Sequence, residues 1–227
     1  MQLYIGNKNY SSWSMRPWVL MKQAGIAFDE VTIPFDGMEA DSPFRVALAR
    51  VTPAGRVPVL VDEGLVIWDT LAIAEYLAEK FPAAQLWPAD AKVRARARSV
   101  VAEMHAGFGA LRSAFGMNIE ASLPEIGAKV LREQEPVRAD VERIVQMWTG
   151  LLEQHGGPLL FGSRFSIADA FYAPVATRFI TYGVPVPGPI AAYMDRVLAL
   201  PGVAAWRTAA LAEQTFVPYD EPYRTHR

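Results

Sequence analysis

The sequence predicts an α+β domain followed by an all-helical domain, and two observations carry this prediction. Over residues 1 to about 80, short β-branched runs alternate with helical patterns in the order β-α-β-α-β-β-α. Beyond residue 91 the strand signals stop, and apolar residues recur at spacings of three and four, which is the helical period. We therefore expect an α+β domain over residues 1–80, a linker over 81–91 and a helical bundle over 92–227.

The first part of the α+β domain reads as a strand–helix–strand unit. The two strands and the helix between them are predicted over residues 2–5, 28–33 and 15–24. Pro17 suits the first turn of this helix, where its missing N–H leaves no hydrogen bond unmade. Gly25 ends the helix. A less regular stretch follows, in which Ser42-Pro43 opens a short helix.

The stretch 56–81 completes this domain and contains residues that could bind a ligand. Two strand runs are joined by Glu63-Gly64, a pair suited to a two-residue hairpin turn. Pro58 cannot donate a ladder hydrogen bond, which leaves two interpretations, an edge strand that tolerates proline or a cis peptide bond. Asp69-Thr70 then opens a helix, where a side-chain oxygen can accept a hydrogen bond from a free backbone N–H. The same helix start favours an anionic group.

The predicted bundle begins after a proline-containing linker that shows no periodicity. Its helices are expected over residues 92–118, 134–155, from 166 onward, 189–199 and 202–213, before a polar tail over 214–227. Gly156-Gly157 ends the second of these helices. Ser166 and Asp169 form a near capping box at the start of the third, with Asp in place of Glu or Gln.

Composition excludes several classes of function. The net charge of −2 gives no basic surplus for nucleic acid or an anionic membrane surface. The chain has no cysteine, so disulfides, thiolate metal sites and a cysteine nucleophile are excluded, and its three histidines lack metal-ligand spacing. No run is long and apolar enough to span a membrane, and the N-terminus does not read as a secretion signal. We expect a cytoplasmic protein without a metal ion.

The combination of Val57-Pro58, a returning strand and an Asp69-Thr70 helix start resembles the second half of the thioredoxin-like domain of glutathione transferases. The order of elements agrees with that domain, and the helical second half extends the resemblance over the whole chain. The resemblance implies that the Val57 backbone pairs with the cysteinyl part of glutathione and that Asp69 and Thr70 bind its γ-glutamyl end. It also implies that Arg56 lies near the glycine end. The alternative for Arg56 is an ordinary surface residue.

The loop before the first helix, Ser11-Ser12-Trp13-Ser14, resembles the Ser-Ser-Cys-Ser segment of zeta-class transferases, with Trp in place of Cys. Related classes place the catalytic residue five positions before an arginine, as Ser11 stands to Arg16. The resemblance therefore implies Ser11, with Ser12 second, as the hydroxyl that stabilises the glutathione thiolate. Simple helix capping and turn solvation are the structural alternatives.

A third resemblance concerns the pocket for the second substrate. The segment Glu103-Met104-His105-Ala106-Gly107-Phe108 resembles a beta-class segment whose histidine lies beside the thiol site. A packed helical histidine is the alternative. The family pattern implies an apolar electrophile pocket between the domains, and the candidates for its lining are Trp13, His105, Phe108, Arg112 and Phe115.

The predicted activity is attack of the glutathione thiolate on a small hydrophobic electrophile by a serine-type transferase that forms a homodimer. A glutathione-dependent isomerase of the maleylacetoacetate type, a reductase and a non-catalytic glutathione-binding scaffold remain alternatives. Arg178 lies at a different spacing from the Ser166–Asp169 box than the substrate-binding arginine of zeta enzymes, which weighs against isomerisation. Reduction through a protein thiol is excluded because the chain has no cysteine.

Overall fold

A four-stranded sheet forms the centre of the N-terminal half. The computed structural model describes residues 1–37 and 39–227. The strands are β1 (Gln2–Ile5), β2 (Asp29–Thr32), β3 (Val59–Asp62) and β4 (Leu65–Trp68), arranged in the order β2-β1-β3-β4. β1 is parallel to β2 and antiparallel to β3, which pairs with β4 in a hairpin. Glu63 and Gly64, with φ of 50° and 86°, form its two-residue turn as predicted.

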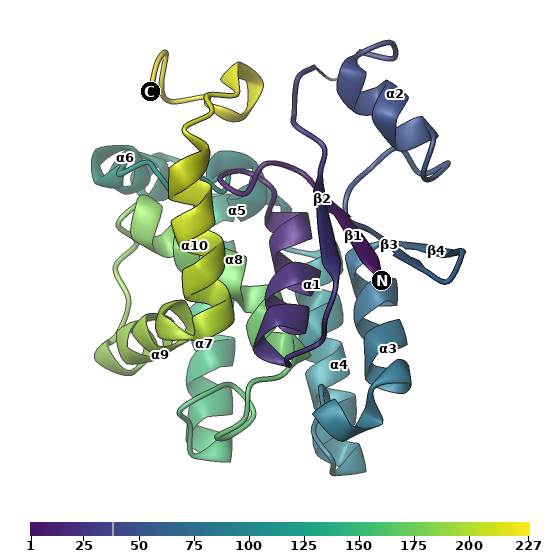
Figure 1. The fold of residues 1–227 in the computed structure, drawn as a ribbon. Coiled ribbons are helices and arrows are strands. Elements are labelled where there is room, and N and C mark those ends of the chain that lie inside the picture. Colours follow the sequence, from purple (N-terminus) through teal and green to yellow (C-terminus); the bar gives the residue numbers. More distant parts are fainter. Residues whose placement is uncertain (38) are drawn as a thin grey trace.

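Three helices complete this half: α1 (Ser12–Gln23), α2 (Pro43–Ala49) and α3 (Thr70–Lys80). The predicted β-α-β-α-β-β-α order is therefore confirmed. α1 contacts α3 on one side and α8 and α10 on the other, so it is the central helix of the molecule (Figure 1). Its apolar face shares one hydrophobic core with the sheet and with the C-terminal helices, including Leu3, Val19 and Trp206.

The second half is all helical, as predicted. Its helices are α4 (Ala91–Ala106), α5 (Gly109–Ala114), α6 (Pro124–Glu133), α7 (Glu135–His155), α8 (Ile167–Thr181), α9 (Gly188–Ala199) and α10 (Pro201–Glu213), with short 3-10 turns η1 (Pro82–Ala84) and η2 (Pro218–Asp220). α8 is buried along almost its whole length and contacts α1, α4 and α9. Its start has the predicted capping box, in which Ser166 and Asp169 bond each other's backbone.

The single helix predicted over residues 92–118 is wrong. The chain breaks after Ala106 because Gly107 is extended and Phe108 takes a left-handed conformation with φ of 56°. α6 was not predicted at all. The helical pattern of the sequence does not reveal the break, because apolar spacing continues across it and only the backbone conformations of Gly107 and Phe108 separate the two helices.

No membrane-spanning segment is found among residues 1–37 and 39–227, since none of their helices combines sufficient length with sufficient apolar character.

Candidate functional site

Two neighbouring cavities lie where the N-termini of α1 and α3 approach the helical half. We call the first, of about 430 Å³, the serine cavity, because Ser11 and Ser12 line it. We call the second, of about 440 Å³, the Asp69 cavity. Trp13, Arg56 and Val57 line both, so the cavities share one wall. Most ligand pockets of proteins have volumes of this order, and two adjoining cavities suit a reaction between two bound molecules.

Asp69 and Thr70 bring the start of α3 to the Asp69 cavity. Asp69 is the N-cap, and its Oδ1 accepts hydrogen bonds from the backbone N of Leu71 (2.8 Å) and Ala72 (3.3 Å). Its Oδ2 lies 3.3 Å from Nε2 of His105. Asp69 has φ of 77°, an uncommon conformation for a residue other than glycine and one that clusters at functional sites. With its side chain 45% exposed, this carboxylate remains accessible to a ligand.

Val57 and Trp13 form part of the wall that the two cavities share. The Val57–Pro58 peptide bond is cis, and β3 begins only at Val59, so the backbone of Val57 lies outside the strand ladder. On the other side, the Thr70 hydroxyl donates to the carbonyl oxygen of Trp13 (3.2 Å). This bond ties the start of α3 to the start of α1. The wall between the cavities is therefore fixed from both helices.

Ser11 and Ser12 differ in how their hydroxyl groups are used. Ser11 is the N-cap of α1: its Oγ accepts from the backbone N of Ser14 (3.4 Å) and donates to the Ser14 Oγ (2.7 Å). Ser12 Oγ instead accepts from Nη2 of Arg178 (3.1 Å). A hydroxyl has one proton: that of Ser11 is donated to Ser14, whereas the Ser12 proton has no acceptor among the residues that the structure describes. α1 begins at Ser12, rather than at residue 15, because Ser11 caps it.

Arginine side chains give the serine cavity a positive charge. Arg45 and Arg56 line it from the N-terminal half, and Arg112 and Arg178 line it from the helical half. The Arg178 guanidinium is buried and also donates from Nε to the carbonyl oxygen of Phe115 (2.7 Å). Burial lowers the pKa of Arg178 to about 10, so it stays charged at neutral pH. The cavity is therefore less apolar than the sequence predicted.

The charges of these arginines are not neutralised by neighbours. In the part of the chain that the structure describes, the ion pairs between arginine and carboxylate do not include Arg56, Arg112 or Arg178. A group of unpaired cations around a cavity attracts an anionic ligand. Such a cavity suits a carboxylate, which arginine can bind through two parallel hydrogen bonds.

Arg16 packs against Trp13, one of the residues that line both cavities. Its guanidinium is fully buried, 4.2 Å from the ring centroid of Trp13 and 5.1 Å from that of Phe171. Burial lowers its pKa to about 9, with the charges of Arg178 and Arg112 adding to the shift. Its interaction with the two rings is a cation–π contact, which holds Trp13 in place between the cavities.

The structure brings together most of the residues singled out in the sequence. Those lining one or both cavities are Ser11, Ser12, Trp13, Arg56, Val57, Asp69, Thr70, His105 and Arg112. Phe108 and Phe115 are instead packed into the hydrophobic core, where Phe115 stacks on Tyr182 with 4.3 Å between ring centroids. His105 faces the Asp69 cavity rather than the serine cavity.

Sequence reasoning missed several residues of the serine cavity. These are Tyr10, Phe35, Phe44, Arg45, Gly55, Gly116, Met117, Tyr219 and Asp220. Nothing in the local sequence marks Tyr219 and Asp220, because the C-terminal tail reaches the cavity only through the tertiary fold.

The described residues contain no group of three or more His, Asp or Glu that could hold a metal ion.

Comparison with known proteins gives consistent matches over both halves of the chain. A family model described as "Glutathione S-transferase, N-terminal domain" matches residues 10–80, and one described as "Glutathione S-transferase, C-terminal domain" matches residues 91–209. Maleylacetoacetate isomerase of Pseudomonas aeruginosa is 32% identical, over 81% of this chain and 84% of that protein. Glutathione S-transferase 1 of Dianthus caryophyllus is 29% identical, over 80% and 78%. A Burkholderia glutathione transferase homolog, solved with bound glutathione, is 26% identical with a TM-score of 0.69, over 92% of this chain and 97% of that one.

Proposed function

Because the chain belongs to the glutathione S-transferase family, we propose that it activates the thiol of glutathione and transfers the thiolate to a small electrophile. Glutathione occupies the Asp69 cavity, with its γ-glutamyl end at Asp69 and Thr70, its cysteinyl backbone at Val57 and its glycine end near Arg56. The second substrate occupies the serine cavity. The observation that carries this proposal is the wall shared by the two cavities, since a bound thiol there faces both the start of α1 and the second substrate.

The protein acts on the thiol through hydrogen bonding and charge. A free thiol has a pKa near 8.5, so a donor hydroxyl and a helix N-terminus increase the thiolate fraction at neutral pH. The sequence favoured Ser11 for this donor. The hydrogen bonds of the structure favour Ser12, because its oxygen already accepts from Arg178 and its proton is free. We therefore assign the donor to Ser12 and the capping of α1 to Ser11.

The charge of the serine cavity supports an anionic second substrate. The sequence pointed to a small hydrophobic electrophile, but four arginine side chains line the cavity. We propose an electrophile that carries a carboxylate held by Arg112 and Arg178. In the conjugation step a sulfur–carbon bond forms, the leaving group departs with the electrons of its bond to carbon, and the thiol proton passes to solvent.

Isomerisation of a carboxylate-bearing double bond is the second candidate function. The 32% identity to a relative named maleylacetoacetate isomerase favours it. In this reaction the thiolate adds to the double bond, the new single bond rotates and the thiolate is expelled, so glutathione is not consumed. Arg178 lines the serine cavity despite its unexpected spacing in the sequence, and it is placed to hold a substrate carboxylate.

The proposed function is tested with two alkylating agents that differ in charge, iodoacetate and iodoacetamide. The chain has no cysteine, so the thiol available to both agents is that of glutathione, and mass spectrometry counts the two products. We expect calorimetry to detect glutathione binding, and the enzyme to accelerate the reaction of iodoacetate at least tenfold more than that of iodoacetamide. Absence of glutathione binding would overturn the function itself.

A matched pair of variants tests the role of the arginines. Arg112→Met is expected to reduce the preference for iodoacetate about tenfold, whereas Arg132→Met, on the exposed face of α6, leaves it unchanged. An equal preference for iodoacetate in both variants contradicts the anionic substrate class.

A separate assay distinguishes the two candidate reactions. Conversion of maleylacetoacetate without loss of glutathione identifies isomerisation, and loss of glutathione in step with product identifies conjugation.

A further inference from the structure

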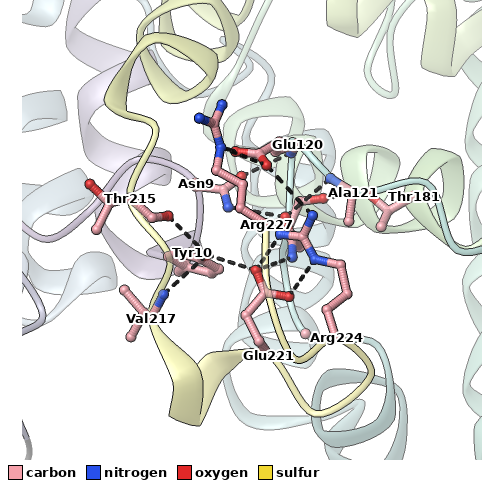
Figure 2. Close-up of polar contacts among 12 residues, drawn as sticks. Asn9, Tyr10, Glu120, Ala121, Thr181, Thr215, Val217, Glu221, Arg224 and Arg227 are labelled. Carbon is pink, nitrogen blue, oxygen red and sulfur yellow. Dashed lines mark hydrogen bonds and ion pairs between the residues drawn. The ribbon is translucent and has the colours of Figure 1, made fainter.

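The C-terminal tail, residues 214–227, folds back onto the loop that precedes α1. Figure 2 shows that Tyr10, the residue before Ser11, is the meeting point. The Tyr10 hydroxyl donates to Oε1 of Glu221 (2.7 Å) and lies 3.1 Å from the carbonyl oxygen of Thr215. The backbone N of Val217 donates to the same hydroxyl (3.4 Å). One side chain of the loop thus holds three residues of the tail.

Glu221 is the buried anchor of the tail. Its carboxylate is 4% exposed and accepts from three side chains: the Tyr10 hydroxyl, Nδ2 of Asn118 (2.8 Å) and Nε of Arg224 (2.8 Å). Burial opposes ionisation, but these donors hold the pKa of Glu221 below its usual range. A buried carboxylate with this many donors is a fixed point, since removing it leaves several polar groups unpaired.

A second set of contacts holds the end of the tail. Arg227 Nε lies 2.9 Å from Oε2 of Glu120, and Nη1 of Arg224 lies 3.5 Å from Oε1 of the same residue (Figure 2). The Tyr223 hydroxyl donates to the carbonyl oxygen of Ala114 (2.9 Å). The tail is therefore tied both to the loop before α1 and to the segment after α5, which are the two sides of the serine cavity.

The consequence of this anchoring is that η2 forms part of the cavity. Tyr219 and Asp220, directly before the anchor Glu221, line the serine cavity. Among the described residues, Asp220 supplies the one carboxyl group of a lining that also holds four arginines. A cavity lined both by cations and by an acid from a different segment distinguishes substrates by where their charges lie, because like charges repel at short distance.

We propose that the tail selects the second substrate, with Asp220 as the side chain that contacts it and Glu221 as the residue that positions Asp220. This inference rests on the proposed conjugation reaction and not on isomerisation of maleylacetoacetate, which itself carries two carboxylates. The arginines bind one carboxylate of the substrate, and Asp220 repels a second carboxylate at the other end. The wild-type enzyme therefore prefers a monocarboxylate to a dicarboxylate of similar shape.

The pH dependence of this selection follows from the groups around Asp220. Burial, with a contribution from Glu221, raises the pKa of the Asp220 carboxyl to about 6. The other charged and titratable side chains that line the same cavity are Tyr10, Arg45, Arg56, Arg112, Arg178 and Tyr219. The pKa of both tyrosines is raised to about 12, mainly by burial, so they stay neutral. Protonation of Asp220 below pH 6 removes its charge, and the discrimination against a dicarboxylate should then weaken.

The test compares 2-bromopropionate with bromosuccinate, which react at the same type of carbon and differ by one carboxylate on the neighbouring carbon. The measured quantity is the ratio of their kcat/KM values with glutathione, in which the ionisation of the thiol cancels. We expect Asp220→Asn to raise the relative rate of bromosuccinate about fivefold to tenfold at pH 7.5. In the wild type the relative rate of bromosuccinate should also rise when the pH is lowered from 7.5 to 5.5. In Asp220→Asn it should stay constant over the same range.

Four further variants separate positioning from folding. Asp195→Asn, an exposed acid on α9, is the matched control and should leave the ratio unchanged. Glu221→Leu should shift the ratio as Asp220→Asn does, while Glu221→Gln, which keeps an acceptor oxygen for Tyr10 and Asn118, should restore it in part. Tyr10→Phe combined with Glu221→Leu should have no more effect than Glu221→Leu alone.

Two outcomes are distinguishable. If the enzyme binds glutathione and turns over both substrates, but Asp220→Asn keeps the wild-type ratio within twofold, the tail does not select the substrate. If the wild type binds no glutathione, the proposed function fails first. Since Asp220 is partly exposed and its substitution leaves the Glu221 anchor intact, the decisive variant does not depend on the survival of a disrupted fold.

Discussion

At the scale of single residues, Asp69 serves both the fold and the proposed site. One carboxylate oxygen caps α3 through the backbone N of Leu71 and Ala72, and the other lies beside His105. An N-cap bond stabilises a helix by about 1 kcal/mol, and a charged acceptor at the same place also binds an ammonium or N–H donor of a ligand. One shared carboxylate therefore connects helix stability with the proposed glutathione binding.

Two substitutions separate these two roles of Asp69. Asp69→Ala should weaken glutathione binding by roughly 1–3 kcal/mol, because a charge-assisted hydrogen bond is lost, and should also reduce the free energy of unfolding by about 1 kcal/mol. Asp69→Asn keeps an oxygen for the cap but removes the charge, so it should weaken binding with little effect on stability. Titration calorimetry and chemical denaturation measure the two quantities. Unchanged affinity in both variants would remove Asp69 from the glutathione site.

A second test at the scale of single residues asks whether Ser11 or Ser12 donates a hydrogen bond to the glutathione thiolate. If Ser12 donates to the thiolate, Ser12→Ala should raise the pKa of bound glutathione by about one unit, as expected for a hydrogen bond of 1–1.5 kcal/mol. Ser11→Ala should mainly lower the stability of α1, since it removes the N-cap. The thiolate absorbance of the complex against pH, together with thermal unfolding, gives both readings. A pKa shift confined to Ser11→Ala would reverse the assignment.

At the scale of elements, the break between α4 and α5 places Arg112 in the cavity. Gly107 ends α4 in an extended conformation, and Phe108 turns the chain with a left-handed backbone. A Cβ atom on Gly107 would lie 2.6 Å from the carbonyl oxygen of Glu103, closer than a carbon normally approaches an oxygen. Position 107 therefore has no room for a Cβ atom and requires glycine. At Gly109, at the start of α5, no atom beyond its chain neighbours and the backbone of its own helix lies within 4 Å of the place that a Cβ would take.

The two glycines give a matched pair of substitutions. Gly107→Ala should destabilise the protein by roughly 1–3 kcal/mol, because backbone atoms must move to relieve the contact. Gly109→Ala should change stability by less than about 1 kcal/mol and in the stabilising direction, since alanine suits a helix better than glycine. Urea denaturation compares them with the wild type. Equal stability of both variants would show that the break does not depend on Gly107.

At the scale of the whole molecule, the edge strand β4 offers a surface for association. β4 pairs only with β3 in the sheet order, and it carries Leu65, which is 52% exposed, and Trp68, which is 47% exposed. Exposed apolar side chains on an edge strand favour contact with another chain. The homodimer expected from the sequence stays a prediction, and we place its interface at this edge.

Sedimentation equilibrium tests this prediction. The wild type should sediment at micromolar concentration with twice the mass of one chain. Leu65→Arg should raise the dimer dissociation constant at least tenfold, because a charge would be buried in an apolar contact. Leu211→Arg is the matched control, since this leucine is 47% exposed on α10, away from β4. A monomeric wild type, or equal effects of both variants, would contradict the proposed interface.

The sequence by itself determined the order of the elements in the N-terminal half and the helical character of the second half. The period of the apolar residues distinguishes strands from helices, and short-range signals such as Glu63-Gly64, Asp69-Thr70 and the Ser166–Asp169 box set their ends. These signals depend on neighbours within a few residues. A sequence pattern carries that information directly, so the hairpin, the starts of α3 and α8 and the two halves could be predicted.

Only the tertiary structure decided which distant residues meet in the serine cavity. Arg178 bonds Ser12 across 166 positions of the chain, and Glu221 bonds Tyr10 across 211. It also decided that the proton of Ser11 is engaged while that of Ser12 is free. The physical reason is that such contacts depend on the packing of α1 against α8 and on the path of the tail, which are set by the whole core rather than by any local pattern.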